Sequence, residues 1–113
     1  MDIRDMQNNA HATACAKNWW LRENLADPNC IAAKLALIHS EVSEALECVR
    51  NDDLSPRHDA LTGKPEGLPS ELADIVIRVA DLCGALNIDL DAAVKEKMAF
   101  NTTRTHRHGG RAL

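Results

Sequence analysis

The sequence predicts an all-α protein, a four-helix bundle formed by one domain over residues 1–113, with a core completed by homo-oligomerisation. Three observations support this fold class. Apolar residues recur at helical spacing in four segments, helix-start signals precede three of these segments, and no segment shows the alternation of a β-strand. A chain of 113 residues has room for one modest core, so a helical partner would add to it.

The helices are expected at residues 4–24, 28–50, 69–86 and 90–104. Asp27 is placed to cap the second helix, with Pro28 at its first position, and Pro69 begins the third helix in the same way. Asp89 is placed to cap the last helix. The stretch between the second and third helices is polar and rich in Pro and Gly, which predicts a long loop.

Composition excludes several classes of protein. The chain has 13 Lys and Arg against 17 Asp and Glu, so its net charge of -4 does not favour specific nucleic-acid binding. The absence of a signal-like N-terminus or a long apolar run predicts a cytoplasmic protein without a membrane segment. The four cysteines are too widely spaced for a zinc pair and are expected to be small, buried and reduced: Cys15, Cys30, Cys48 and Cys83.

A polar stripe runs along the third predicted helix. At about 100° per residue its members fall within about 80° of one another; they are Glu71, Asp74, Arg78 and Asp81. Apolar residues flank the stripe on both sides: Leu72, Ile75, Val79, Leu82 and Leu86 on one, Ile77 on the other. Such a helix cannot easily turn its acids to bulk water, so we expect them to face a shared cleft.

The second helix carries a matching pair of acids. Glu41 and Glu44 lie about 60° apart, whereas Glu47 points away and is expected to be solvated. The adjoining core stripe is expected to contain Ile38, Val42, Ala45 and Val49. Two helices therefore present two acid pairs beside one core.

Four converging carboxylates repel one another unless protons or a cation intervene. Ligation by oxygen alone suits Mg2+, with Mn2+ as a possible substitute. A di-iron site would require a Glu-x-x-His motif, and His39 lies on the face opposite Glu41. The alternative is that these are structural carboxylates in ion pairs with Arg78, Arg50 or Lys34.

The last helix is expected to bind phosphate. Lys97, Asn101 and Arg104 share one face, next to a predicted core strip of Val94 and Met98. No acid follows Lys97, while Arg107 and Arg111 add positive charge. Basic and amide donors beside a metal site favour phosphate oxygens; the alternative for Arg107 and Arg111 is a solvated basic terminus.

Trp19 and Trp20 are the candidate base-binding residues. With Phe100 they are the only aromatic residues other than histidine, and aromatic faces stack on nucleobases with little preference among them. The alternative is that one or both fill a core or dimer gap. Neighbouring positions on a helix point about 100° apart, so we expect one to pack and one to stay available.

These residues carry a resemblance to a known family. The segments SEVSEALE, SELADIVIRV and KMAFNTTRTHRHGG resemble MazG-like members of the all-α nucleoside triphosphate pyrophosphohydrolase superfamily, whose signature is E-x-x-E followed by E-x-x-D. Glu41 and Glu44 match the first half of this signature, and Glu71 and Asp74 the second. Many relatives have two adjacent acids where this chain has Ser40 and Glu41.

The resemblance implies a Mg2+-dependent hydrolase that converts (d)NTPs to (d)NMP and pyrophosphate, for house-cleaning or regulation of the dNTP pool. The metal ligands would be Glu41, Glu44, Glu71 and Asp74, and either Glu41 or Glu44 would be the catalytic base. The family pairs as homodimers or homotetramers. Two alternatives stay open: a phosphoribosyl-ATP-type pyrophosphatase, and a non-catalytic helical dimer that binds a nucleotide or a protein.

Overall fold

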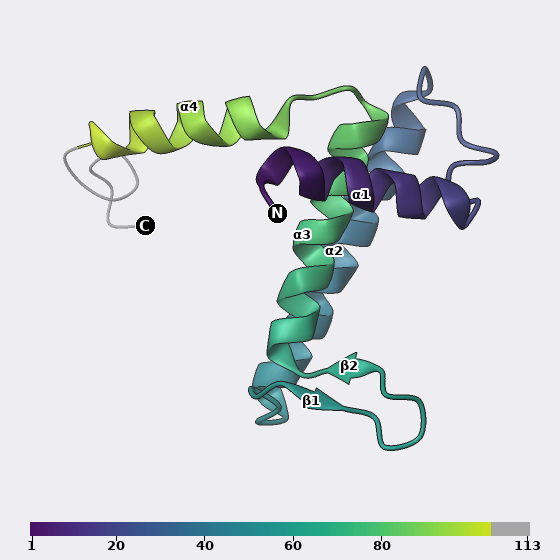
Figure 1. The fold of residues 1–113 in the computed structure, drawn as a ribbon, viewed down its shortest axis with the longest axis vertical. Coiled ribbons are helices and arrows are strands. Elements are labelled where there is room, and N and C mark those ends of the chain that lie inside the picture. Colours follow the sequence, from purple (N-terminus) through teal and green to yellow (C-terminus); the bar gives the residue numbers. More distant parts are fainter. Residues whose placement is uncertain (105–113) are drawn as a thin grey trace.

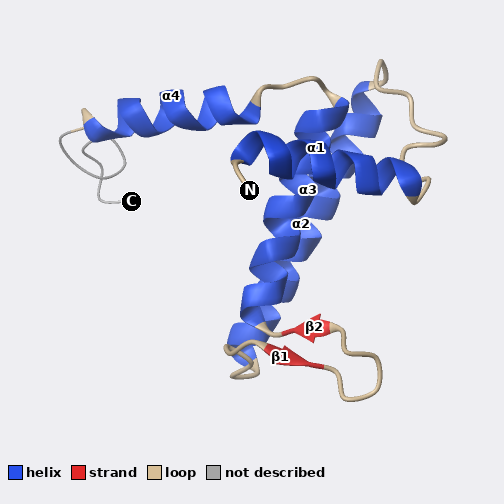
Figure 2. Cartoon of the chain, in the orientation of Figure 1, coloured by secondary structure: helices blue, strands red, loops and turns tan. Residues whose placement is uncertain are grey.

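The computed structural model describes residues 1–104 and confirms the all-α fold class (Figure 2). Four helices carry most of this part of the chain: α1 (Ile3–Ala16), α2 (Pro28–Arg50), α3 (Leu68–Ala85) and α4 (Leu90–Thr102). The strands β1 (Arg57–His58) and β2 (Pro65–Glu66) form a short hairpin between α2 and α3. No helix in the described residues is both long enough and apolar enough to cross a membrane.

Local signals at the helix starts act largely as predicted. Asp27 accepts a hydrogen bond from the Asn29 amide and Pro28 is the first residue of α2. Asp89 caps α4 in the same way through the Ala92 amide. By contrast, α3 starts at Leu68 after Gly67, which has a φ of 97°. A Cβ at Gly67 would lie 2.3 Å from the Ser55 carbonyl oxygen, so only glycine fits this helix start.

The first helix is shorter than predicted, because α1 ends at Ala16 rather than at residue 24. Asn18 follows with a φ of 62°, and the amides of Asn18 and Trp19 bond back to the carbonyls of Cys15 and Ala14. Asparagine tolerates this left-handed conformation, which ends a helix. Trp19 and Trp20 therefore lie in a turn after α1 and not within it.

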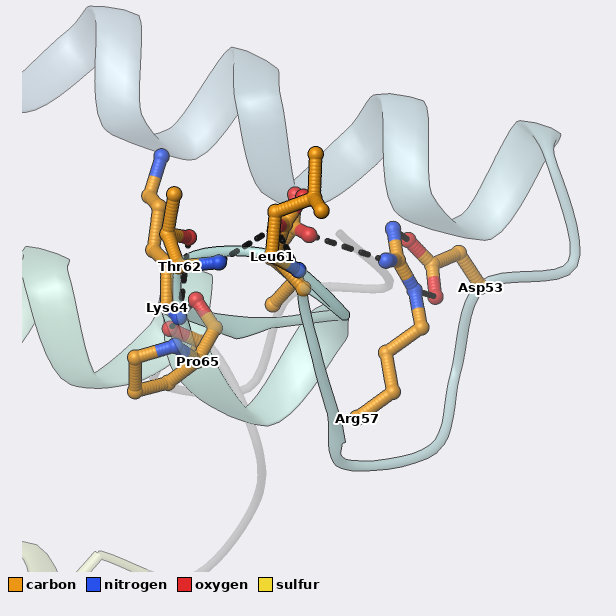
Figure 3. A network of polar contacts seen from close by, with 9 residues as sticks. Asp53, Arg57, Leu61, Thr62, Lys64 and Pro65 are labelled. Atoms are coloured by element: carbon orange, nitrogen blue, oxygen red, sulfur yellow. Dashed lines mark hydrogen bonds and ion pairs between the residues drawn. The ribbon is translucent and has the colours of Figure 1, made fainter.

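The predicted long loop contains a short antiparallel hairpin, which the sequence did not indicate. Arg57 pairs with Glu66 and His58 with Pro65. Arg57 donates hydrogen bonds to both carboxylate oxygens of Asp53 at 2.8 Å and to Glu66 at 3.1 Å (Figure 3). The carboxylate of Asp59 accepts hydrogen bonds from the backbone amides of Leu61 and Thr62. These side-chain bonds hold a short hairpin that strand pairing alone would stabilise only marginally.

The helix α3 is at the centre of the arrangement, in contact with α1 and with α2 (Figure 1). Gly84 permits the close approach of α1, since a Cβ there would lie 2.6 Å from the Cβ of His11. The last helix, α4, contacts α1 and runs away from the α2–α3 pair (Figure 1). The four predicted helices are present, but α4 does not pack along α2.

The core is thin and built from small side chains. Its buried apolar residues are Ala14, Cys30, Ala45, Ala80, Leu82 and Cys83. Several predicted core positions are exposed instead: Val42 and Val49 at 50% and Met98 at 64%. The four cysteines are free, as predicted, but Cys15 is exposed and Cys48 only half-buried. One chain therefore covers only part of its apolar surface.

Candidate functional site

The site lies along the seam where α2 and α3 pack together. An ion pair crosses this seam: Arg78 Nε donates to Glu41 Oε1 at 2.6 Å. Glu41 is the only buried charged residue in the described part of the chain. Three of the four residues of the predicted stripe on α3 are half-buried, and only Asp74 is exposed. Arg78, one of the half-buried three, neutralises the predicted metal ligand Glu41.

Three of the four predicted metal ligands come together. Carboxylate oxygens of Glu41, Glu44 and Glu71 all lie within 4.8 Å of one another. Glu41 is buried, Glu71 half-buried and Glu44 exposed, so the cluster opens from the seam to the surface. Asp74 is exposed and contributes no ligand atom to this cluster.

Two oxygens of the cluster have no hydrogen-bond partner. Glu41 Oε2 and Glu71 Oε2 are both buried and unpaired in the described structure. Burial raises the pKa of Glu71, and the negative charge of Glu44 raises it further. Buried polar atoms are nearly always paired, so two orphan oxygens on neighbouring carboxylates indicate a place for a cation or for protons.

A second polar group lies next to the seam, around Asp81 of α3. The Trp20 indole Nε1 donates to both Asp81 oxygens, at 2.9 and 3.1 Å, and His11 Nδ1 lies 2.8 Å from Asp81 Oδ1. The Lys34 ammonium sits 4.5 Å from the centre of the Trp20 ring and pairs with Glu23 at 3.3 Å. Trp20 is thus held by its edge and covered on one face.

A hollow of about 430 Å³ lies between these groups and the ion pair. Its walls are Trp19, Trp20, Lys34, Leu37, Arg78, Asp81 and Leu82. Trp19 is 54% exposed, whereas Trp20 is half-buried. One tryptophan is therefore packed and the other is available, as predicted, although both lie in a turn and not in a helix.

The predicted phosphate-binding residues do not join the acid cluster within one chain. Lys97, Asn101 and Arg104 are exposed on α4, which runs away from the α2–α3 pair (Figure 1). The Lys97 ammonium lies over the Phe100 ring at 5.6 Å. Arg107 and Arg111 lie outside the described residues.

Sequence reasoning missed the basic lining of the hollow. The sequence predicted Lys34 and Arg78 as possible ion-pair partners of the acids, and Arg78 also as part of the polar stripe, but it did not indicate that both line this hollow. His11 was not considered at all. Its contact with Asp81 spans 70 residues, and helical spacing relates only residues within one helix.

Comparisons with protein-family models, with curated proteins and with solved structures found no match for this chain.

Proposed function

We propose that the chain is a Mg2+-dependent nucleoside triphosphate pyrophosphohydrolase of the MazG-like kind. One observation carries this proposal: the carboxylates of Glu41, Glu44 and Glu71 converge within 4.8 Å, and two of their oxygens are buried without partners. A surface cluster of acids would be solvated and would need no cation. This one is partly withdrawn from water, so its negative charge requires compensation.

The residues fit a hard divalent ion. The donors are carboxylate oxygens alone, which Mg2+ and Mn2+ prefer, and the exposed position of Glu44 leaves the site open to water and to phosphate. Glu41, Glu44 and Glu71 would hold the ion, with Asp74 one turn further along α3. When bound, the ion supplies charge neutralisation for a polyphosphate and lowers the pKa of a water molecule.

The two candidate bases are not equivalent in this arrangement. Glu41 Oε1 already accepts a hydrogen bond from Arg78, so this oxygen is engaged in the ion pair across the seam. Glu44 is exposed at the mouth of the cluster. We assign Glu44 as the group that takes the proton when water attacks the triphosphate and the bond to the leaving pyrophosphate breaks.

The hollow beside the ion pair would hold the nucleoside. Trp19 offers an exposed ring for stacking, and Lys34 and Arg78 add positive charge to the lining of the same hollow. Trp20 has the different role of holding Asp81 and Lys34 in place. Lys97, Asn101 and Arg104 would meet phosphate only if α4 or a second copy brings them to the acids.

The test is product analysis by ion exchange after incubation with each canonical NTP and dNTP, in Mg2+ and in EDTA. Monophosphate and pyrophosphate that form only with Mg2+, and not with Glu71→Gln, would support the proposal. Glu47→Gln is the matched control, because Glu47 is exposed and pairs with Arg50 outside the cluster. Orthophosphate as the product would contradict the assigned bond.

A non-catalytic binding protein is the second candidate, and the short Arg78–Glu41 ion pair favours it, because such a pair also stabilises a fold. In that case Glu44→Gln would leave ligand binding intact, and no nucleotide would be hydrolysed. A phosphoribosyl-ATP-type substrate would show as Mg2+-dependent release of pyrophosphate from that compound and from none of the NTPs or dNTPs.

A further inference from the structure

Cys15, His11 and Asp81 form a series of polar contacts where α1 packs against α3. His11 and Cys15 are one turn apart on α1, and Cys15 Sγ lies 3.5 Å from His11 Nε2. On the other side of the ring, His11 Nδ1 lies 2.8 Å from Asp81 Oδ1. A thiol, an imidazole and a carboxylate are thus linked in that order.

The surroundings of Asp81 decide which nitrogen of His11 can accept the thiol proton. The Trp20 indole can only donate, and it donates to both oxygens of Asp81. Asp81 therefore acts as an acceptor toward His11 as well, so Nδ1 carries the ring proton and Nε2 has the free electron pair. Nε2 is also the nitrogen nearer to Cys15, since Sγ lies 4.0 Å from Nδ1. The thiol is thus directed at a proton acceptor.

Packing holds His11 in this position. Gly84 lets α1 approach α3 so closely that a Cβ there would lie 2.6 Å from the Cβ of His11. His11 and Asp81 are half-buried, whereas Cys15 is exposed. A nucleophile, a base within hydrogen-bond reach and a third group that orients the base are together the parts of an activated thiol.

The arrangement suits proton transfer and not metal binding. A metal ion requires ligand atoms that converge on one point. Among residues 1–104, the acid cluster on α2 and α3 is the only group of three or more His, Cys, Asp or Glu residues whose ligand atoms lie within 4.8 Å of one another. In the series described here the imidazole of His11 stands between the thiol and the carboxylate.

The other three cysteines are in surroundings that keep the thiol protonated. Cys30 donates to Glu23 Oε2 at 3.1 Å, and this hydrogen bond raises the pKa of the Cys30 thiol. Burial raises the pKa of Cys48 and of Cys83. Because the thiolate is the nucleophilic form, these three cysteines are expected to react slowly. Exposure and a neighbouring base single out Cys15.

We propose that Cys15 is a modification site that exchanges with low-molecular-weight disulfides. The thiol proton passes to His11 Nε2, and Asp81 stabilises the imidazolium that forms. This imidazolium offsets the partial negative charge at the C-terminal end of α1, which would otherwise disfavour a thiolate.

The exchange needs no reactant besides the disulfide. Sγ of Cys15 attacks one sulfur of the disulfide RS–SR, so that the bond between its two sulfurs breaks and a bond from Sγ to one of them forms. The other sulfur leaves as RS⁻ and takes the proton from His11 to give RSH. Cys15 is oxidised and the leaving sulfur is reduced.

The modification site is separate from the hollow proposed for the nucleoside. Trp20 and Asp81 are among the walls of that hollow, whereas Cys15 and His11 are not. The reagent therefore reaches Cys15 from the solvent, which suits a small soluble disulfide. The proposal does not rest on the proposed hydrolase activity, and its test measures thiol chemistry alone.

The first test treats the reduced full chain with oxidised glutathione and locates the adduct by mass spectrometry of its peptides. A single glutathionyl group is expected on Cys15, while the other three cysteines stay unmodified. The variant Cys15→Ser should take up none under the same conditions. An adduct that forms first on another cysteine, or no adduct at all, would overturn the proposal.

The second test asks whether His11 is the base. Wild type should show the ultraviolet absorbance of a thiolate at neutral pH, and both Cys15→Ser and His11→Gln should lose it. His11→Gln should also lower the rate of glutathionylation by at least about tenfold. Asp81→Asn should change both readouts in the same direction, because an amide NH₂ opposite Nδ1 moves the ring proton to Nε2.

The matched control is His39→Gln, since His39 is exposed on α2, and this variant should behave as the wild type. Circular dichroism checks that each variant is folded. Folded His11→Gln and Asp81→Asn variants that keep the thiolate absorbance and the wild-type rate would overturn the role given to His11, as would a His39→Gln variant that loses them.

Discussion

Arg78 and Glu41 are joined across the α2–α3 seam by a 2.6 Å bond from Nε to Oε1, while Glu41 Oε2 is buried without a partner. Glu41 is thus satisfied on one oxygen and free on the other. The arrangement fits a residue with two tasks, in which the ion pair orients the carboxylate and the second oxygen remains for a ligand.

Removal of Arg78 should destabilise the fold. The variant Arg78→Ala leaves Glu41 buried with no positive partner, and since Arg78 itself is 37% exposed we expect a loss of about 2 kcal/mol in the free energy of unfolding. Urea unfolding followed by circular dichroism measures this. Arg50→Ala, which breaks the exposed pair with Glu47, should cost less than about 0.5 kcal/mol.

The coupling between the two residues has its own test. In the double variant Glu41→Gln/Arg78→Ala no buried charge is left alone, so the loss should be smaller than the sum of the two single losses. Additive losses would show that the 2.6 Å contact has no energetic role.

Divalent cations should stabilise the protein through the acid cluster. Mg2+ at a hundred times its dissociation constant adds about 2.7 kcal/mol if it binds only the folded chain, so the melting temperature should rise above its value in EDTA. Glu71→Gln should abolish this rise. In EDTA the Glu71→Gln variant should melt no lower than the wild type, because it removes a half-buried carboxylate that repels Glu44.

The control for the cation effect is Glu47→Gln, which should keep the full rise because Glu47 lies outside the cluster. If Glu71→Gln responds to Mg2+ as the wild type does, the three carboxylates are not its ligands.

The two tryptophans should have separable roles. Trp19→Ala removes an exposed ring, so we expect an unchanged melting temperature and an increase of about tenfold in KM for the nucleotide, the effect of losing one base stack. Trp20→Ala removes the donor to Asp81 and the surface under Lys34, and should cost about 2 kcal/mol of stability. Thermal melts and steady-state kinetics together measure both. The reverse pattern would exchange the two assignments.

The hairpin should weaken in acid. The hydrogen bond from Arg57 holds the pKa of Asp53 in the folded protein below its ordinary value. At a pH above that ordinary value the ion pair therefore contributes its full stabilisation to the fold. This contribution is lost as the pH falls through the lower pKa of the folded state. The stability difference between wild type and Asp53→Asn should therefore shrink below about pH 4. Urea titrations from neutral pH to about pH 3 would show it.

Asp52→Asn is the neighbouring control, since Asp52 has no ion-pair partner among residues 1–104, and it should change stability little at any pH. A stability difference for Asp53→Asn that is constant with pH would mean that the ion pair does not hold the hairpin.

Features that depend on one helical turn could be read from the sequence. Asp27, Pro28 and Asp89 start helices as predicted, because a cap needs only the next few amides. The i, i+3 spacing of Glu41 and Glu44 correctly put both acids on the side of α2 that meets α3. The end of α1 was missed, because Asn18 at a φ of 62° is one of several conformations that asparagine accepts.

The remaining features depend on how the helices pack. The positions of α1 and α2 against α3 decide which oxygen of Glu41 accepts the hydrogen bond from Arg78. They also bring Trp20 and His11 to Asp81, from 61 and 70 residues away in the sequence. Periodicity assigns a residue to a face of its own helix and cannot say what covers that face. For this reason the pattern predicted that the acids converge, whereas only packing showed that Asp74 stays out of their cluster and that Val42 and Val49 remain uncovered.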